Sequence, residues 1–538
     1  MERIDLNTLD DVQRLESGKE YVFAKGEYGI FAERTQEKFL YLSNNDGGVK
    51  KVAFYMENLN DVTLDFSGSV LTVHGRIMPF YAQNCENVTL KNVTVLYDRP
   101  FFTCGQIVDR GESYAELAID KNVFPYRIEN GSIVAYGKYW EKSLADGINL
   151  FIEMDNERKR PAYNTGIILP LIGNEVIRHP TPPIYQSAWR AEEGQNGNVI
   201  LRGDFSFLTG NNRFVLTHEE RWHCVFAAVD CKNVALQDVT IRESGAMGAL
   251  FQNCENVSLR GVCVQARQDE AYLISTNCDA THFVNCRGKV SVENCTFEHM
   301  MDDGGNFHGI YTLVKEKKEN AVVAALSHFQ QYGVNVYKAG DIIEIASPDM
   351  QKRETFTVQS ARLLSPSEIQ LNLSGNMDFI ADGYVIDNIT AFPEIHIQNC
   401  RTGNNRPRGF LLNSNKKTVV EGCTFYNSDV GIAISGDNSY WFEATGVRDV
   451  TIRENTFDNC GYHCSDYAMF VRAEIKANPD IADYHRGIRV NNNLFKTFSG
   501  GCVYVANCKD FSFENNVVER TDAYPLRRLH QPVEYAKK

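Results

Sequence analysis

The sequence predicts an all-β protein built as a right-handed parallel β-helix that carries inserted small β-barrel domains. Three observations predict this fold. A short apolar–polar pattern recurs along much of the 538-residue chain, its closest copies lie 23 residues apart, and no helical periodicity accompanies it. Self-similarity at a period of about 20–50 residues is typical of solenoids, and strands this short favour a β-helix over leucine-rich or helical repeats.

Each copy of the pattern consists of an apolar pair, two polar or turn residues and a second alternating pair. Examples read Val-Thr-Leu-Lys-Asn-Val-Thr-Val at 88–95 and Val-Ser-Val-Glu-Asn-Cys-Thr-Phe at 290–297. The pattern describes two short strands that meet at a corner. The apolar residues that precede the corner in successive copies are Leu236, Leu259, Val292, Val420, Ile452, Val490 and Phe513.

Equivalent residues of stacked coils lie about 4.8 Å apart, so like residues should form ladders. We expect an asparagine ladder at one corner and stacked cysteine, valine, isoleucine and phenylalanine side chains inside. The predicted asparagine ladder contains Asn294, Asn455, Asn492 and Asn515. Fifteen cysteines recur in phase with the repeat, which indicates buried thiols and not a disulfide framework. Three of these cysteines, each followed by x-Asn-Val, are Cys85, Cys231 and Cys254.

Two long interruptions of the repeat predict inserted domains. The second contains alternating strands at 341–345 and 355–358, which are typical of a small antiparallel barrel. The predicted division is residues 1–96 as N-terminal coils and cap, 97–225 as an inserted β-rich domain, 226–310 as central coils, 311–392 as a β-barrel insert, and 393–538 as C-terminal coils and cap.

Composition narrows the class of partner. A net charge of −14 argues against nucleic acid or an anionic membrane, and hydrophobic content of 43% is enough for a large core. No run of about 18 apolar residues predicts a transmembrane helix, and the first twenty residues lack the apolar core of a signal peptide. We therefore expect a cytoplasmic protein, or a secreted or periplasmic one if a leader peptide has been removed. Pairing through a flat face would allow a homodimer.

The segment from His299 to Gly309 carries the chemistry. It places the paired acids Asp302 and Asp303 close to Asn306 and His308. Glycosidic bond cleavage needs such a pair of carboxyl groups, because one donates a proton and the other activates water or attacks the sugar. Alone, the pair could also be a turn cap and a solvated side chain, and His308 could be a structural hydrogen-bond donor.

Counting ten residues on from each apolar residue that precedes a corner places Asp302 and Asp303 in the turn before a strand. The same count puts Asp269 and Glu270 at the same phase one coil earlier, before an expected strand at 272–274. Asp279 and Asp437 follow the ends of the strands expected at 272–274 and 432–434. Acids therefore gather on one face near mid-chain. Because clustered carboxylates repel, at least one should have a raised pKa.

Two further groups are candidates for sugar binding. Arg406 and Arg408 begin the coil after the second insert and could bind sugar hydroxyls or neutralise the acids. Tyr440, Trp441 and Glu443 follow a polar turn, where the aromatic rings could stack on a pyranose. The alternative for these aromatic residues is a capping cluster over the β-helix.

Together these motifs resemble glycoside hydrolase family 110, the α-galactosidases that act on terminal α-1,3-linked galactose. The matching stretches are Asp279-Ala280-Thr281-His282-Phe283, Asp302-Asp303-x-x-Asn306-x-His308-Gly309, Gly340-Asp341, Arg408-Gly409 and Gly436-Asp437-x-x-Tyr440-Trp441-Phe442-Glu443. The resemblance covers about 230 to 500. One departure is Gly304-Gly305, where we expect a bulkier first residue, and it puts the shape of the sugar site in doubt.

The resemblance implies hydrolysis with inversion at the anomeric carbon, without a metal or other cofactor. It places Asp279, Asp302 and Asp303 in the catalytic centre, and we expect Asp302 and Asp303 to position and deprotonate the attacking water. Asp279 is the first choice for the proton donor, with a glutamate of the barrel insert as the alternative. Neighbouring coils with a lateral offset could supply the roughly 6.5–9.5 Å between carboxyls that inversion requires.

The implied substrate is an oligosaccharide or glycan with a terminal α-galactose, of blood group B type, linear Gal-α-1,3-Gal type, or both. The residues expected to bind it are Asn306, His308, Arg408, Asp437, Tyr440, Trp441, Glu443, Asp269 and Glu270. Two other functions remain open. A polygalacturonase-like hydrolase is disfavoured by the negative net charge, and a non-catalytic carbohydrate-binding β-helix would spread acids and aromatic residues along a whole face.

Overall fold

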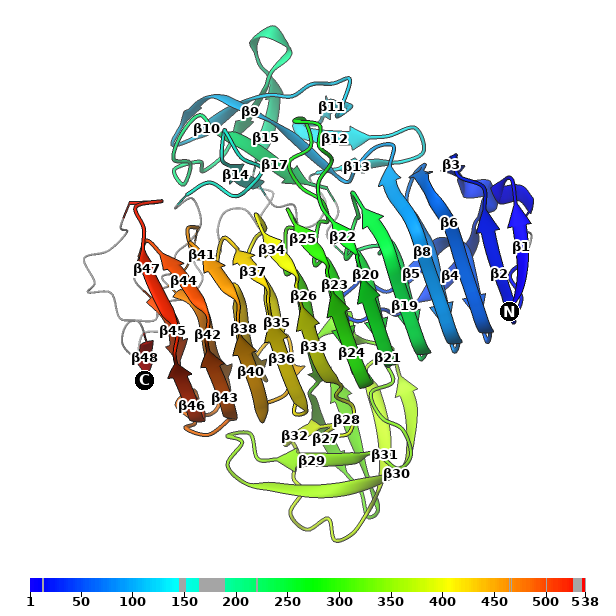
Figure 1. The fold of residues 1–538 in the computed structure, drawn as a ribbon, viewed down its shortest axis with the longest axis vertical. Helices are drawn as coiled ribbons and strands as arrows, with labels where there is room; N and C mark the ends of the chain where they lie inside the picture. The colour runs from blue at the N-terminus through cyan, green and yellow to red at the C-terminus, as the bar shows by residue number, and fades with distance from the viewer. Residues whose placement is uncertain are drawn as a thin grey trace.

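The computed structural model describes residues 1–11, 14–144, 151–163, 189–218, 221–463, 465, 467–499, 501–525 and 535–537. Two long sheets run the length of the row of coils and enclose a common core, with the N-terminus at one end of the row and the C-terminus at the other (Figure 1). Strands of successive coils pair in parallel in both sheets, as β19 (Lys232–Ile241) does with β21 (Glu255–Arg260). The predicted parallel β-helix is confirmed.

Sheet A contains twenty strands. They are β1 (Glu2–Leu6), β2 (Lys19–Phe23), β3 (Glu27–Ile30), β6 (Asn60–Val73), β8 (Glu86–Tyr97), β19, β21, β22 (Cys263–Val264), β24 (Arg287–Glu293), β25 (Thr296–Glu298), β33 (Glu394–Gln398), β34 (Arg401–Gly403), β36 (Lys417–Glu421), β37 (Thr424–Tyr426), β40 (Asp449–Arg453), β41 (Thr456–Asp458), β43 (His485–Asn491), β44 (Leu494–Thr497), β46 (Cys508–Glu514) and β47 (Val517–Arg520).

Sheet B contains thirteen strands. They are β4 (Gln36–Leu40), β5 (Gly48–Glu57), β7 (Ile77–Gln83), β18 (Phe226–Val229), β20 (Ala249–Gln252), β23 (Thr281–Val284), β26 (Gly305–Ile310), β35 (Phe410–Leu412), β38 (Ile432–Asp437), β39 (Glu443–Ala444), β42 (Tyr467–Glu474), β45 (Gly501–Val505) and β48 (Tyr535–Lys537). The 3-10 helices are η1 (Leu9–Asp11), η2 (Ala32–Arg34), η4 (Gln195–Gly197) and η5 (Phe329–Gln331), and no α-helix occurs in the described residues.

The register of sheet A follows the repeat of the sequence. Leu236 pairs with Leu259, Leu259 with Val292, and Val490 with Phe513, so the residues before the corner stack as expected. Inside, phenylalanine rings stack face to face, with centroids 4.4 Å apart for Phe283 and Phe307. Parallel stacking therefore turns a periodic sequence into continuous apolar ladders.

Cysteine ladders occur as predicted. The backbone N–H of Cys85 donates to the sulfur of Cys231, and Cys254 and Cys286 continue the same corner. A second ladder, at the corner between the two halves of sheet A, contains Cys295, Cys400 and Cys423. These seven side chains are buried free thiols.

The predicted asparagine ladder is wrong by one residue at Asn455. Asn294, Asn492 and Asn515 share the left-handed corner position, with φ of 54°, 56° and 55°. In that position the coil of Asn455 carries Glu454 instead. Asn455 occupies the next, inward position, where its stacking partners are Asn493 and Asn516. The sequence alone does not separate these positions, because asparagine suits both an αL corner and a buried amide ladder.

The first insert forms antiparallel sheets. Its strands are β9 (Phe102–Gly111), β10 (Tyr114–Ala118), β14 (Phe151–Met154), β15 (Arg190–Glu193), β16 (Val199–Arg202) and β17 (Arg213–Thr217) in one sheet, and β11 (Tyr126–Glu129), β12 (Ser132–Tyr136) and β13 (Glu141–Ser143) in another. The insert lies above the row of coils in Figure 1.

The second insert is a closed six-stranded barrel, as predicted. Its strands are β27 (Thr312–Lys317), β28 (Ala321–Leu326), β29 (Ile342–Ala346), β30 (Arg353–Ser365), β31 (Glu368–Ser374) and β32 (Val385–Asp387). It lies below the coils in Figure 1 and is tied to them by a bidentate ion pair between Arg287 and Asp341, at 2.8 and 2.9 Å. The Gly340-Asp341 motif therefore docks the barrel.

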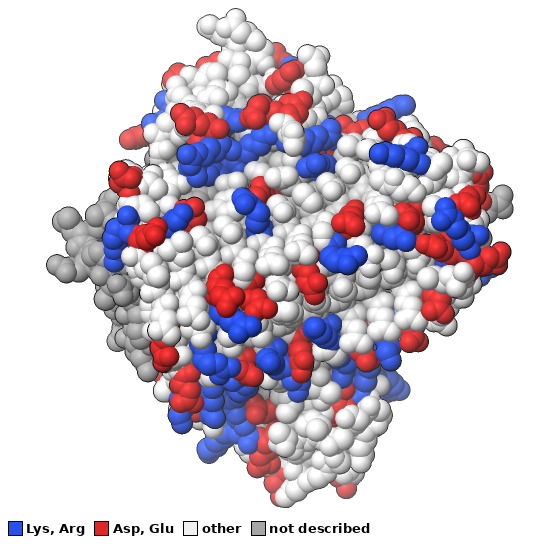
Figure 2. All heavy atoms as spheres, viewed as in Figure 1, with Lys and Arg blue, Asp and Glu red and all other residues white. Residues whose placement is uncertain are grey.

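The surface drawn in Figure 2 mixes basic and acidic side chains over the coils and both inserts, and neither sign dominates this face. No helix in the described residues is long and apolar enough to span a membrane.

Candidate active site

Three aspartates meet where two neighbouring coils enter sheet B. Thr281 pairs with Gly305, so Asp279 and Asp303, each two residues earlier, occupy equivalent positions. The carbonyl of Asp303 accepts from Ala280 N at 2.8 Å, which continues the pairing into the turn. Because Gly305 pairs in turn with Phe410, Arg408 holds this position in the next coil. The ladder at this point of the β-helix therefore reads Asp279, Asp303, Arg408.

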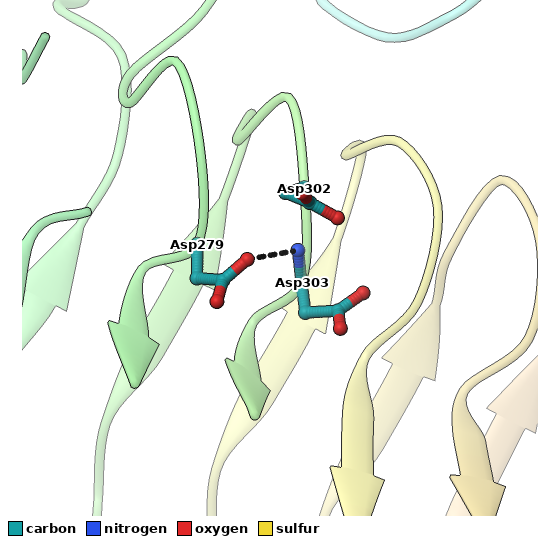
Figure 3. A group of neighbouring side chains, drawn as sticks. All are labelled: Asp279, Asp302 and Asp303. Carbon is teal, nitrogen blue, oxygen red and sulfur yellow. Dashed lines mark hydrogen bonds between the residues drawn. The ribbon is translucent and has the colours of Figure 1, made fainter. Parts of the chain in front are cut away.

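Figure 3 shows Asp302 and Asp303 on one turn and Asp279 on the turn before it, with a hydrogen bond of 3.2 Å from Asp303 N to Asp279 Oδ1. One carboxylate oxygen of each residue lies within 4.8 Å of the others. These nearest-oxygen distances are shorter than the roughly 6.5–9.5 Å between the carboxyl groups of an inverting pair, although carboxyl groups lie further apart than their nearest oxygens. The lateral offset that we expected to widen the group is absent, since Asp279 and Asp303 stack directly.

The predicted phase of Asp269 and Glu270 is wrong. The loop between β22 and β23 is longer than the count of ten residues assumed, no strand forms at 272–274, and Asp279 occupies the place assigned to them. Glu270 contacts the first insert, with its carboxylate 3.3 Å from Arg213 and 3.8 Å from Lys159. Asp269 caps its own turn by accepting from Ala271 N. The structure does not bring these two acids to the three aspartates.

Two arginines bind the aspartates. Arg408 Nε donates to Asp303 Oδ1 at 2.7 Å, and Arg221 Nη2 donates to Asp302 Oδ2 at 2.9 Å. Asp303 is 1% exposed, whereas the Asp302 side chain is 17% exposed. Asp302 is therefore the most accessible carboxylate of the group. Two positive charges against three carboxyls favour one protonated acid.

The pKa values of Asp279 and Asp303 lie well above the usual range. Burial is the largest cause for both. The charge of Asp302 raises the pKa of Asp279 further. Arg408 lowers the pKa of Asp303, and Asp302 and Asp279 raise it, but burial prevails. The group can thus hold a proton near neutrality, as clustered carboxyls at catalytic sites do.

A chain of buried histidines leads away from Asp279. Asp279 Oδ2 lies 2.6 Å from His282 Nδ1, and His282 Nε2 lies 2.9 Å from His308 Nε2. His308 Nδ1 donates to the carbonyl of Gly309 at 2.7 Å. Burial, and next the neighbouring His308, lower the pKa of His282 well below its usual value, so its imidazole is neutral.

A neutral His282 leaves two proton arrangements for the chain. Either Asp279 donates to His282 Nδ1 and His282 donates to a neutral His308, or His308 is cationic and donates to His282, which donates to ionised Asp279. The two differ by one proton moved from Asp279 to His308. The burial that raises the pKa of Asp279 favours the first, in which Asp279 is a carboxylic acid.

Glu443 faces this chain from β39. Its carboxylate accepts from Asn44 at 3.0 Å and from Asn306 at 3.3 Å, and lies 3.6 Å from His308 Nε2. Burial opposes ionisation, but the charge of Arg408 and the hydrogen bond from Asn306 favour the carboxylate, and the pKa of Glu443 lies below its usual value. The buried glutamate beside the aspartates therefore comes from the β-helix.

Two buried acceptors in this region have no hydrogen-bond donor within the described part of the chain. They are Asp303 Oδ2 and Asn306 Oδ1. Buried polar atoms are nearly always paired, so such atoms call for water or a ligand with hydroxyl groups.

Asp437 and the aromatic residues have separate roles. The Asp437 carboxylate accepts from Tyr440 N at 3.1 Å and Trp441 N at 2.6 Å, so it fixes the turn. The guanidinium of Arg221 lies 5.2 Å from the centroid of the Trp441 ring. The side chain of Arg221 therefore lies between Trp441 and Asp302. Asp437 fixes the turn that carries Trp441.

The aspartate group also has a spacing that would suit a metal ion, because one oxygen of each lies within 4.8 Å of the others. Carboxylate oxygens are the ligands that Mg²⁺ and Ca²⁺ prefer. Here Arg221 and Arg408 already supply two positive charges beside these carboxylates, and both charges would repel a bound cation.

Close packing between coils explains why residues 304 and 305 are glycines. A Cβ on Gly304 would lie 2.7 Å from the carbonyl of Gly409, and one on Gly305 would lie 3.0 Å from the Phe410 ring. Both glycines are buried between coils. A larger residue at 304 would press on the backbone of the next coil, so this departure concerns coil packing.

Sequence reasoning missed Arg221, Asn44 and the role of His282. His282 lay within a matched motif, so its signal was present. Arg221 and Asn44 lie outside the repeat copies, and only the fold brings them to the aspartates.

Comparison with known proteins gives matches along the chain. The family models for GLAA-B beta-barrel domain I and GLAA-B beta-barrel domain II match residues 105–210 and 321–378, within the two inserts. Alpha-1,3-galactosidase A of Shewanella woodyi is 29% identical over 526 residues, covering 95% of this chain and 82% of that protein. Alpha-1,3-galactosidase B of Bacteroides thetaiotaomicron is 28% identical, covering 98% and 84%.

Among solved structures, the A-module of a mannuronan C-5 epimerase from Azotobacter vinelandii is 9% identical, with a TM-score of 0.38 over 99% of this chain and 97% of that one. A score this low adds nothing to the strand pairing described above.

Proposed function

This chain belongs to the alpha-1,3-galactosidase A/B family of glycoside hydrolases with GLAA-B β-barrel domains, and from this premise we propose that it releases terminal α-1,3-linked galactose from glycans. The observation that carries the proposal is the buried stack of Asp279 and Asp303 beside the accessible Asp302. It offers ionised and protonated carboxyls within reach of one glycosidic bond.

We assign the proton donor to Asp279. Its raised pKa and its hydrogen bond to a neutral His282 support a carboxylic acid at neutral pH. The proton that Asp279 shares with His282 Nδ1 would pass to the glycosidic oxygen when the bond to the leaving group breaks. Asp302 and Asp303 would position the attacking water and accept its proton. The unpaired Asp303 Oδ2 supports this role, because a water molecule would satisfy it. Asn306, His308 and Glu443 would bind and orient the galactose.

We propose inversion at the anomeric carbon, as the family resemblance implies. The spacing of the aspartates makes retention the competing outcome, since retaining pairs are only about 5–5.5 Å apart. Proton NMR during hydrolysis of Gal-α-1,3-Gal separates the two. Early release of β-galactose supports inversion, and early release of α-galactose rules it out.

The substrate range is best tested with matched glycans. We expect cleavage of linear Gal-α-1,3-Gal, and a blood group B trisaccharide will show whether the fucose branch is accepted. Polygalacturonate serves as a negative control, because Arg221 and Arg408, the cations that could hold its carboxylates, each already donate to an aspartate. A protein that binds these sugars without cleaving any of them would instead be a carbohydrate-binding β-helix.

A further inference from the structure

The barrel insert contributes a loop to the side of the active site. This loop, 328–331, contains η5 and is held on the β-helix at three points. Gln331 Nε2 donates to the carbonyl of Trp441 at 2.6 Å, Gln330 Nε2 donates to Asp46 at 2.9 Å, and Asn44 N donates to the carbonyl of Gln330 at 2.8 Å. The position of the loop relative to the site is therefore fixed by direct hydrogen bonds.

The loop and the 440–441 turn together form an aromatic cluster, which we call the aromatic rim. The His328 ring lies 4.6 Å from Trp441, 4.8 Å from Phe329 and 5.4 Å from Tyr440, measured between centroids. Phe329 and Tyr440 remain 59% and 62% exposed. Exposed aromatic side chains that join into one patch mark a binding surface, whereas single exposed apolar residues do not.

The aromatic rim is continuous with the catalytic group. Trp441 carries the guanidinium of Arg221 at 5.2 Å from its ring centroid, and the same guanidinium donates to Asp302 at 2.9 Å. Asp302 is the accessible carboxylate. A glycan that places one sugar at Asp302 would therefore bring the neighbouring sugar to the aromatic rim.

We propose that the aromatic rim is the subsite for the sugar that follows the scissile galactose, so that the barrel insert takes part in choosing the substrate. This inference rests on the proposed function. When the cleaved residue is a terminal galactose, every other sugar of the glycan lies on the leaving-group side. The occupant is a neutral pyranose, whose apolar face stacks on an aromatic ring. The rim carries no charge of its own, since burial and the nearby Arg221 lower the pKa of His328 to about 4.

The test uses two substrates that share the galactose and differ in the leaving group. Gal-α-1,3-Gal has a second sugar, whereas α-galactosyl fluoride has none. We expect Phe329→Ala and Tyr440→Ala each to lower kcat/KM for the disaccharide by about five- to tenfold, mainly through KM. The same variants should leave kcat/KM for the fluoride within about twofold of the wild type. Tyr139→Ala, an exposed aromatic residue packed on Phe31 and His74, is the matched control.

Each result has a definite reading. Equal losses on both substrates, or no loss on the disaccharide, overturn the proposal. Light scattering of the Phe329→Ala, Tyr440→Ala double variant tests the rival occupant, a second copy of the chain, because loss of a dimer would make the rim a subunit interface. If the wild type cleaves neither substrate, the proposed function fails. Calorimetric titration with the disaccharide then decides the inference: unchanged affinity in the double variant refutes it, and weakened affinity supports it.

Discussion

Two ladders of the same β-helix show how stacking treats different polar side chains. In the inward asparagine ladder, which contains Asn455, Asn493 and Asn516, Asn455 and Asn493 each donate an amide N–H to the next residue of the stack, at 3.0 and 2.9 Å. An amide contains both a donor and an acceptor, so the ladder satisfies itself from coil to coil. In the acid ladder, the ionised forms of Asp279 and Asp303 contain acceptors only, and they are satisfied by a proton, an arginine or a ligand. The amide ladder therefore stabilises the fold, whereas the carboxyl groups of the acid ladder remain able to exchange protons and bind a ligand.

The largest expected effect is the loss of kcat when aspartates of the catalytic group are replaced by asparagine, the residue of the amide ladder. Asp279→Asn, Asp302→Asn and Asp303→Asn should each lower kcat on Gal-α-1,3-Gal by at least roughly two orders of magnitude, the scale of a lost acid or base. A rate near that of the wild type for any variant would remove that residue from the mechanism.

Thermal unfolding of the same variants checks the sign of the electrostatic argument. Because the pKa of Asp303 is raised by burial, the folded state binds more protons than the unfolded state, and stability falls as pH rises from the unfolded pKa through the folded one. Asp303→Asn removes this contribution of the carboxyl group to the pH dependence of stability. Its Tm should therefore fall less than that of the wild type between acidic and neutral pH.

The second largest effect is a loss of stability when a carboxyl group is placed in the amide ladder by the substitution Asn455→Asp. A buried carboxylate would face the Asn493 oxygen that now accepts from the Asn455 amide. We expect a loss of about 2–4 kcal/mol at neutral pH in urea unfolding. The loss should shrink at acidic pH, where the new carboxyl takes up a proton. Asn455→Ala is the control, and a loss independent of pH would show that charge is not the cause.

The third effect concerns the histidine chain. His282→Gln retains hydrogen-bonding groups but cannot pass a proton between Asp279 and His308. We expect kcat on Gal-α-1,3-Gal to fall about tenfold, with a change below about threefold on α-galactosyl fluoride, whose leaving group needs little protonation. Activity that requires protonated Asp279 is lost as pH rises through its pKa, so this alkaline limb should move in the variant. Equal losses on both substrates would indicate a structural role.

The smallest expected effect is that of chelation. Arg221 and Arg408 supply the positive charge beside the aspartates, so dialysis against EDTA should change kcat/KM by less than about twofold. Full loss of activity, restored by Mg²⁺ or Ca²⁺, would show that the three carboxylates hold an ion.

The sequence was sufficient for the β-helix, because a periodic pattern determines the register directly, as the pairing of Leu236 with Leu259 shows. It also pointed to Asp279, Asp302 and Asp303, which stand in local motifs and which the fold brings together. It failed for Asp269, because loop length varies from coil to coil and counting residues assumes that it does not. It also failed for Arg221, which lies 81 residues from Asp302 in the chain and has no periodic signal.

The two inserts leave the β-helix on either side of the coils that carry the aspartates. Strand β8 pairs with β19 across the first insert, and β24 pairs with β33 across the second. Each pairing closes a long loop, which costs chain entropy before any contact repays it. Arg408 reaches Asp303 only after the second closure, over a separation of 105 residues. During refolding, activity should therefore return later than the bulk of the β-sheet signal, so that catalysis reports a long-range step of assembly.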